Sequence, residues 1–169
     1  MYFEGKGLRK STRLALGWYS RAAEQRDELA LIQLGNMYEK GLGTEVDPRR
    51  AVVLYLIAYR IGSARAANHL ASMFRRGSGV RRDSSLAYSL YQQAVKTANT
   101  PDIAENPSYS RTAYYWLGNM SEKGNGVERT LEIAKEWYRL GAASDNASCT
   151  EALDRLRGEM GGKRISETE

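Results

Sequence analysis

The sequence predicts an all-α fold, a right-handed α-α superhelical solenoid of antiparallel helix pairs that ends in a C-terminal capping helix. Three observations lead to this expectation. Glycine pairs recur at a fixed spacing, apolar residues follow helical spacing between them, and residues that favour helix starts follow each pair at one distance. The chain has 169 residues, of which 42% are apolar and 27% charged, and it contains only three prolines. These values are typical of a soluble domain of ordinary size with room for long helices.

The repeat is marked by four G-x-G triplets. Their spacings are 36, 36 and 47 residues, counted between the first glycines Gly5, Gly41, Gly77 and Gly124. A period in this range is typical of solenoids built from short helical units. The longer last interval indicates an insertion, which we place at 99–110, where two prolines interrupt helix formation. Such a segment either re-aims the last repeat or forms a neutral surface loop.

The residues before each triplet predict the first helix of a pair. Ala30, Leu34 and Tyr38 stand at helical spacing and form one apolar stripe. Small residues at Gly35 and Ala71 let a second helix approach closely. The triplet then ends the helix, because glycine adopts the left-handed conformation at little cost.

The residues after each triplet predict the second helix. Four residues beyond the second glycine stands a residue type that caps helix N-termini, namely Ser11, Asp47, Asp83 and Thr130. Pro48 follows Asp47 at the first helical position, where proline is tolerated. A tyrosine then recurs fourteen residues after each first glycine, at Tyr19, Tyr55, Tyr91 and Tyr138.

Together these positions give the pattern A-x-x-x-L-G-x-x-Y-x-x-G-x-G-V-x-x-D-x-x-x-A-x-x-W-Y-x-x-A-A. The match is clearest in Ala30, Leu34, Gly35, Tyr38, Gly41, Gly43, Asp47, Ala51, Tyr55 and Ala58. The pattern resembles the Sel-1-like repeat, a subfamily of the tetratricopeptide repeats, over nearly the whole chain up to about residue 143. The resemblance implies a protein-interaction role, since such proteins are adaptors for many unrelated partners.

The repeats divide the chain into segments. We expect a truncated leading repeat at 1–29, full repeats at 30–65, 66–110 (with the insertion) and 111–146, a capping helix at 147–162 and a flexible tail at 163–169. Gly161 and Gly162 are expected to end the capping helix. Most of the first helix is absent from the leading repeat, so Leu14 and Trp18 should be partly uncovered. We therefore expect this end to contact another chain, a second copy or a missing N-terminal segment.

The net charge of +5 is concentrated in the middle of the chain. Residues 41–85 hold eight arginines and three acidic residues, which accounts for all of it. A local cluster suits an acidic protein partner better than a nucleic-acid backbone, which usually requires a more basic domain. Solvated helix ends are the alternative explanation. The longest apolar run, at 51–59, is too short to span a membrane.

No catalytic, cofactor-binding or metal-binding constellation stands out, and we predict no enzyme activity. His69 is the only histidine and Cys149 the only cysteine, so a histidine-based triad and an intrachain disulfide lack partners. We expect His69 to be a packing or surface residue and Cys149 to be half-buried. Penicillin binding, which the resemblance brings in through cysteine-rich members, is disfavoured because this chain lacks their paired cysteines.

The resemblance places the first helix of each pair on the concave face of the superhelix. The partner-binding residues that it implies are Asn36, Glu39, Lys40, Arg65, Asn68, Ser72, Arg75, Arg76, Tyr115, Asn119 and Lys123, with Ile32 and Glu122 on the same face. Polar side chains that recur at one repeat position can hydrogen-bond an extended peptide, and the arginines can bind a carboxylate. The alternative is that these residues are only the solvated side of each helix.

A second surface competes with the concave one. The second helix of the first full repeat carries Val52, Val53, Leu56 and Ile57, where the other repeats are mostly polar. Such an apolar excess indicates either a partner or oligomer contact, or packing between neighbouring second helices.

The main functional prediction is a non-enzymatic adaptor or scaffold that binds a protein or peptide, of acidic character, in the concave groove. The resemblance leaves two alternatives, a bacterial immunity protein that neutralises a secreted type VI lipase-like effector, and an envelope or host-interaction factor. No nucleic-acid partner is expected. The single cysteine favours a cytoplasmic location, whereas a signal peptide before residue 1 would direct the protein to the periplasm or outside the cell.

Overall fold

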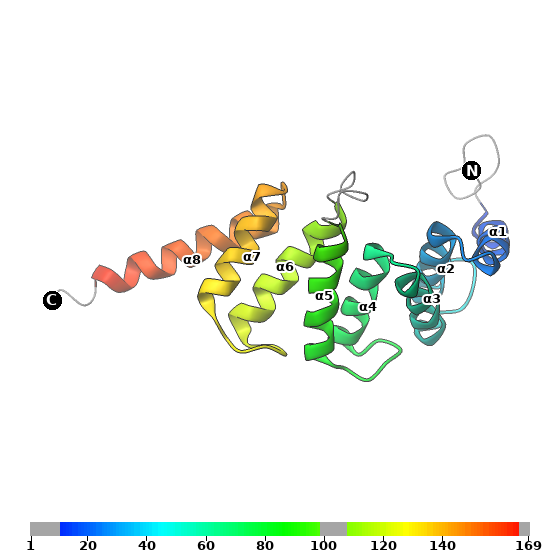
Figure 1. The fold of residues 1–169 in the computed structure, drawn as a ribbon, viewed down its shortest axis with the longest axis horizontal. Coiled ribbons are helices and arrows are strands. Elements are labelled where there is room, and N and C mark those ends of the chain that lie inside the picture. Colours follow the sequence, from blue (N-terminus) through cyan, green and yellow to red (C-terminus); the bar gives the residue numbers. More distant parts are fainter. Residues whose placement is uncertain (1–10, 99–107, 166–169) are drawn as a thin grey trace.

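The computed structural model describes residues 11–98 and 108–165, with side chains at 11–98 and 110–157. These residues form eight helices and no strand. The helices are α1 (Thr12–Glu24), α2 (Glu28–Lys40), α3 (Pro48–Arg60), α4 (Ala64–Arg76), α5 (Ser84–Ala98), α6 (Ser108–Lys123), α7 (Leu131–Ala143) and α8 (Ala147–Ile165). Each helix packs against the next along the chain, and the row forms an elongated solenoid (Figure 1). The predicted fold class is confirmed.

The first glycine ends a helix, as predicted, in the three triplets that the structure describes; the triplet at Gly5 lies outside the described residues. Gly41, Gly77 and Gly124 follow α2, α4 and α6 and have φ values of 69°, 72° and 70°. The amide groups of Gly41 and Gly77 bond back to carbonyls of the last helical turn. These are left-handed C-caps, which satisfy carbonyls that the helix itself leaves open.

All four predicted N-cap residues stand directly before a helix, and three of them cap it with a side-chain hydrogen bond. The side chains of Ser11, Asp47 and Asp83 accept hydrogen bonds from amides of the following first turn. Thr130 occupies the N-cap of α7 without a side-chain cap bond. Its hydroxyl donates instead to the carbonyl of Glu128, at 3.5 Å, so its position as N-cap is confirmed but its side chain does not bond the first turn.

The small residue in the middle of a first helix makes room for a tyrosine. A Cβ on Gly35 would lie 2.5 Å from the ring of Tyr55, and a Cβ on Gly118 would lie 2.5 Å from the ring of Tyr138. Tyr55 and Tyr138 are fully buried. The close helix approach that the sequence predicts therefore depends on a tyrosine ring that packs directly against the backbone of a glycine.

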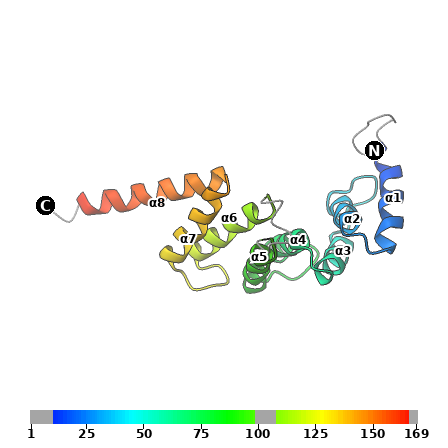
Figure 2. The ribbon, with the colours of Figure 1, turned by 45° about the horizontal axis from the view of Figure 1, so that its top comes forward.

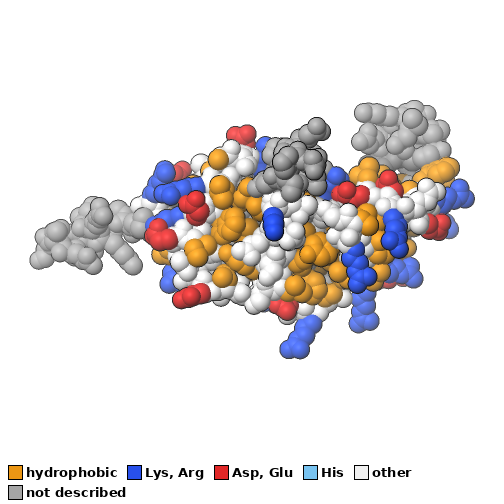
Figure 3. Space-filling view, in the orientation of Figure 1, with side chains coloured by type: hydrophobic (Ala, Val, Ile, Leu, Met, Phe, Trp, Pro, Cys, Tyr) orange, Lys and Arg blue, Asp and Glu red, His pale blue; other side chains and the backbone are white. Residues whose placement is uncertain are grey.

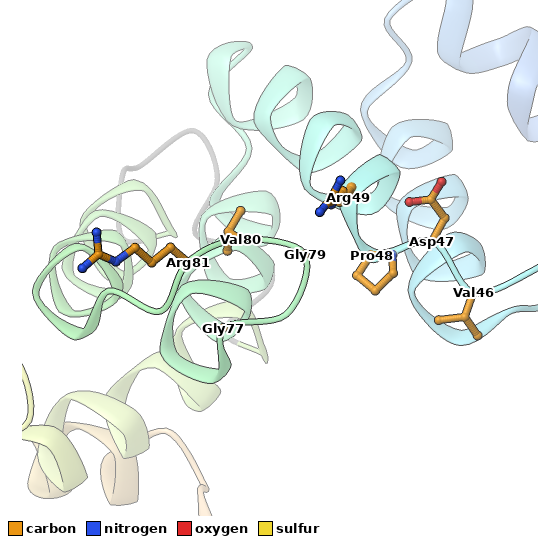
Figure 4. A pocket seen from close by; sticks show the side chains of 8 residues that line it. All are labelled: Val46, Asp47, Pro48, Arg49, Gly77, Gly79, Val80 and Arg81. Atoms are coloured by element: carbon orange, nitrogen blue, oxygen red, sulfur yellow. The ribbon is translucent and has the colours of Figure 1, made fainter.

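The second glycine of the three described triplets has a role that the sequence does not reveal. Gly79, at φ +70°, approaches the backbone of Pro48, and a Cβ there would lie 2.5 Å from the Pro48 carbonyl (Figure 4). Gly43 lies in the same way against Thr12, and Gly126 against Ser84. Each of these three triplets thus contacts the start of the second helix one repeat earlier, and the loops stack along one edge.

The C-terminal helix is longer than predicted. It begins at Ala147, as expected, and Ala152, Leu153 and Leu156 are buried. It continues to Ile165, so the predicted end at Gly161 is wrong. Glycine lowers helix stability by only about 1 kcal/mol, which weakens a helix without having to end it. Figure 2 shows α8 extending beyond α7, away from the other helices.

The insertion predicted at 99–110 falls largely outside the described residues. Residues 108–110 belong to the first turn of α6, which has 16 residues against 13 in α2 and in α4. At the opposite end, Leu14 and Trp18 of α1 are 53% and 54% exposed. The expectation that they are partly uncovered is confirmed.

Candidate interaction surface on the A helices

The first helices of the pairs, α2, α4 and α6, are called the A helices, and α1, α3, α5 and α7 the B helices. The A helix α6 contacts both α4 and α8, while α4 is joined to α2 by an ion pair described below. The A helices therefore share one face, which α8 continues. The eleven partner-binding residues predicted above define the A-helix face, and each of them is at least partly exposed.

Ile32, which the resemblance places on this face, is 3% exposed and belongs to the core. The placement is therefore corrected. The physical reason is that α2 packs against helices on both sides, α1 and α3, and so needs apolar side chains over more than one stripe.

Glu39 stands at the centre of a hydrogen-bonded cluster in the first full repeat. Its carboxylate accepts a bond from the Tyr55 hydroxyl at 3.1 Å and from Arg76 at 2.6 Å. Burial raises the pKa of Tyr55 above its usual range, and the Glu39 charge adds to the shift. Because Arg76 comes from the next A helix, the ion pair links two repeats.

Glu122 repeats this arrangement at the other end of the solenoid. It accepts a bond from the Tyr138 hydroxyl at 2.9 Å and two bonds from Arg155 of α8, each at 2.8 Å. The hydrogen bond from Arg155 lowers the pKa of Glu122 against the effect of burial. A fork-shaped guanidinium on a carboxylate is the strong form of this interaction.

The middle repeat departs from this pattern because Arg75 stands where the others have glutamate. The guanidinium carbon of Arg75 lies 3.5 Å from the centroid of the Trp116 ring on α6, a close cation–π contact. The Tyr91 hydroxyl and the Arg75 Nε are both buried and have no hydrogen-bond partner. Burial raises the pKa of Tyr91, while the positive charge of the nearby Arg75 opposes the shift.

This difference predicts unequal effects of removing the two hydroxyls. Tyr138→Phe should lower the free energy of unfolding by about 1–2 kcal/mol, because it removes a hydrogen bond to a charged group. Tyr91→Phe should change it by less than about 0.5 kcal/mol, because that hydroxyl makes no bond. Urea unfolding monitored by circular dichroism measures both. Equal losses in the two variants would contradict the assignment.

Three of the predicted residues stand at one repeat position, and their side chains are partly exposed. They are Asn36, Ser72 and Asn119. Lys40 and Lys123, at the ends of α2 and α6, are exposed. Arg65 and Asn68 are partly exposed and interact within the chain.

A hollow of about 260 Å³ lies on the A-helix side next to the capping helix. It is lined by Tyr115, Tyr138, Ser148, Glu151, Ala152 and Arg155. Tyr115 is packed edge-on against Trp116, with ring centroids 5.1 Å apart. Of the predicted residues, Tyr115 alone lines this hollow; the sequence did not indicate the contribution of α8, since one copy of a helix gives no repeat register to compare.

A larger hollow, of about 570 Å³, lies at the edge where the glycine loops stack (Figure 4). Its lining is Val46, Asp47, Pro48, Arg49, Gly77, Gly79, Val80 and Arg81. Basic side chains project from that edge, near the loop between α4 and α5 (Figure 3). The arginine excess of residues 41–85 is thus divided between this edge and the A-helix face.

The second predicted surface is smaller than expected. Val52 is 5% exposed and packs in the core, since α3 is covered by both α2 and α4. Val53 and Leu56 are 56% and 39% exposed, and Ile57 is partly buried. The surface thus retains Val53, Leu56 and part of Ile57.

The lone histidine and lone cysteine are packing residues. The His69 ring is stacked on Tyr55, with centroids 4.5 Å apart, and burial lowers its pKa. Cys149 is fully buried rather than half-buried, because it packs against the bare backbone of Gly141, and burial raises the pKa of its thiol to about 11. A thiol in that state is a poor nucleophile. Within the described residues no three His, Cys, Asp or Glu side chains gather as a metal site, and no helix there is long and apolar enough to cross a membrane.

Comparisons with known proteins agree with this architecture. Chitin synthase regulator SKT5 of Saccharomyces cerevisiae is 27% identical over 86% of this chain and 25% of its own length. Protein sel-1 homolog 2 of Mus musculus is 36% identical over 54% of this chain and 14% of its own length. The chain spans a quarter or less of these curated relatives.

Solved structures extend the similarity over most of the described fold. A Sel1 repeat protein from Oxalobacter formigenes superposes with a TM-score of 0.81 at 27% identity, covering 92% of this chain and 59% of that one. The protein c5321, a protective antigen of uropathogenic Escherichia coli, gives 0.78 at 32% identity, over 92% of this chain and 31% of that one. A family model described as Sel1 repeat matches residues 1–27, 29–63, 64–96 and 112–146. With well over half of its residues matched, the chain belongs to the Sel1 repeat family.

Proposed function

We propose that the chain is a non-enzymatic interaction module that holds a protein or peptide on its A-helix face. The observation that carries the proposal is the row of partly exposed Asn36, Ser72 and Asn119, which stand at one position in three successive repeats. Polar side chains repeated at the pitch of the helix pairs can bond an extended backbone at regular intervals. The hollow beside Tyr115, which has both aromatic and polar lining residues, offers a place for a side chain of the same ligand.

The relatives support a role in interaction rather than in one reaction. Their names place them in unrelated processes. One is a chitin synthase regulator, another, HRD3B of Arabidopsis thaliana, is a component of an ERAD-associated ubiquitin ligase, and a third is the alginate biosynthesis protein AlgK of Azotobacter vinelandii. What this chain has in common with them is the repeat itself, whose regular surface suits binding.

The proposal is tested with peptides selected on the wild-type chain from a display library. The double variant Asn36→Ala, Asn119→Ala should bind the selected peptides about tenfold more weakly, because two hydrogen bonds of about 0.5–1.5 kcal/mol each are lost. Fluorescence polarisation gives the dissociation constants. A thermal scan of each variant establishes that it is folded.

The matched control is Gln92→Ala, Gln93→Ala, which removes two exposed amides from the B helix α5. Its affinity should equal that of the wild type. If both double variants bind equally well, or if only the glutamine variant loses affinity, the ligand lies elsewhere and the proposal is wrong.

A cytoplasmic location and an acidic partner are part of the same proposal.

A further inference from the structure

The middle of the A-helix face contains an incomplete copy of a cluster that is complete in the flanking repeats. Glu39, Arg75 and Glu122 occupy one repeat position, two residues before the first glycine of the triplet. In the flanking repeats the glutamate accepts bonds from the tyrosine of its own repeat and from an arginine of the next helix on the same face. The chain itself therefore displays the arrangement in which a carboxylate is held by a tyrosine and an arginine.

The middle repeat supplies donors but no carboxylate. The Tyr91 hydroxyl and the Arg75 Nε are buried without a hydrogen-bond partner, which is a costly state for a polar group. Among the described residues Arg75 has no ion pair, and the nearest matching glutamates are already bonded to Arg76 and Arg155.

Lys123 adds a second cation by its register. Arg76, the residue just before Gly77, reaches back from α4 to Glu39 on α2. Lys123 is the residue just before Gly124 on α6, so it holds the same repeat position as Arg76, one A helix further along the chain. Its side chain is exposed and has no ion pair within the described part of the chain.

The Trp116 ring packs against the Arg75 guanidinium. The ring centroid lies 3.5 Å from the guanidinium carbon, a distance at which the ring covers one side of the cation. A guanidinium stacked in this way keeps the N–H groups of its edge for a ligand, and their fork matches the two oxygens of a carboxylate. A ligand group that is planar, carries one negative charge and presents two oxygens, as a carboxylate does, fits this site.

We propose that Arg75, Lys123 and Tyr91 form a carboxylate-binding subsite, filled by an acidic side chain or the C-terminal carboxylate of the bound peptide. The subsite rests on the proposed function, since it lies on the A-helix face. It specifies a carboxylate as the chemical group that this face selects in its ligand. The incoming carboxylate takes the place that Glu39 and Glu122 hold in the flanking repeats. Arg75 supplies a paired N–H edge and Lys123 a second positive charge.

The test uses short probes, so it does not depend on a natural partner. The wild-type chain is titrated at low salt with three acetylated tripeptides: Gly-Glu-Gly amide, Gly-Gln-Gly amide, and Gly-Gly-Ala with a free C-terminal carboxylate. The readout is the NMR signal of the Trp116 indole N–H and of the Arg75 Nε–H. Saturable shifts are expected with one or both carboxylate probes and none with the glutamine probe. The two carboxylate probes distinguish an acidic side chain from a C-terminus.

Three variants, one of them a control, make the result specific. Arg75→Glu restores the tyrosine–glutamate pair of the flanking repeats, so it should fold, with an unfolding midpoint close to that of the wild type, and should show no saturable shift. Arg75→Gln should weaken binding at least tenfold, the effect of losing a charge-assisted bond. Arg81→Glu, an equal charge change at an exposed loop residue, should bind as the wild type does.

Three results would overturn the subsite. The first is that neither carboxylate probe causes a saturable shift. The second is that the glutamine probe causes shifts equal to those of the carboxylate probes, and the third is that Arg75→Gln binds as tightly as the wild type. Failure of the proposed function is a separate result, since it appears as selected peptides that bind the Asn36→Ala, Asn119→Ala variant as well as the wild type. A chain that binds peptides on this face without any carboxylate requirement keeps the proposed function and loses the subsite.

Discussion

Replacing Gly79 by alanine is expected to lower the free energy of unfolding by about 2–4 kcal/mol, which combines the cost of a side chain in the left-handed region with that of overpacking. The residue has a φ of +70°, and the new Cβ would lie 2.5 Å from the Pro48 carbonyl. Both contacting atoms of Pro48 belong to the backbone, so no side-chain rotation relieves the overlap. Urea denaturation followed by circular dichroism gives the change.

Two other glycines separate the contributions. Gly62 has a φ of +96° but open space around it, so Gly62→Ala carries the conformational cost alone, about 1 kcal/mol. Gly17 lies inside α1 with nothing within 4 Å, and Gly17→Ala should stabilise the chain by about 0.5–1 kcal/mol. If Gly79→Ala costs no more than Gly62→Ala, the loops separate freely and do not hold the repeats together.

Leu117→Ala is the second large effect, with an expected loss of about 2–5 kcal/mol. Leu117 on α6 is fully buried, in the same core cluster as Tyr91 and Tyr138 of the neighbouring B helices. Truncation removes apolar contacts and leaves a cavity that helices fixed on both sides cannot close. Chemical denaturation measures the loss.

The control for this cavity is Leu14→Ala on α1, where the side chain is 53% exposed. It should cost less than about 1 kcal/mol, since little apolar surface returns to water. A loss below about 1 kcal/mol for Leu117→Ala would show that the repeats move together to fill the space.

The helices and their ends could be predicted because they follow from local chemistry. Gly41 and Gly77 end helices by their own backbone preference, and Asp47 and Asp83 start them by their own side chains. Thr130 shows the limit of that rule, since its hydroxyl found another acceptor in Glu128.

The interactions of the candidate site depend on contacts between repeats, which one sequence does not display. The resemblance placed Arg75 and Arg76 together as ligand-binding cations, yet one stacks on Trp116 and the other pairs with Glu39. Which neighbour each side chain reaches is decided by the stagger of the A helices, and that is a property of the packed solenoid. The one sequence signal for this site is that Arg75 stands at the repeat position where the flanking repeats have Glu39 and Glu122.

The sequence also did not predict which residues of the B helix α3 face the core. Val52 and Val53 are adjacent and identical, but one is buried and the other 56% exposed. Only the rotation of α3 between its two neighbours decides which of them faces the core.

The contact between successive glycine loops has a mechanical consequence. Gly43, Gly79 and Gly126 each bring backbone against backbone along one edge, and the last contact is kept even though the insertion lies between α5 and α6. Close-packed backbone resists compression far more than it resists separation. The solenoid is therefore expected to resist bending toward its glycine edge and to bend more easily away from it.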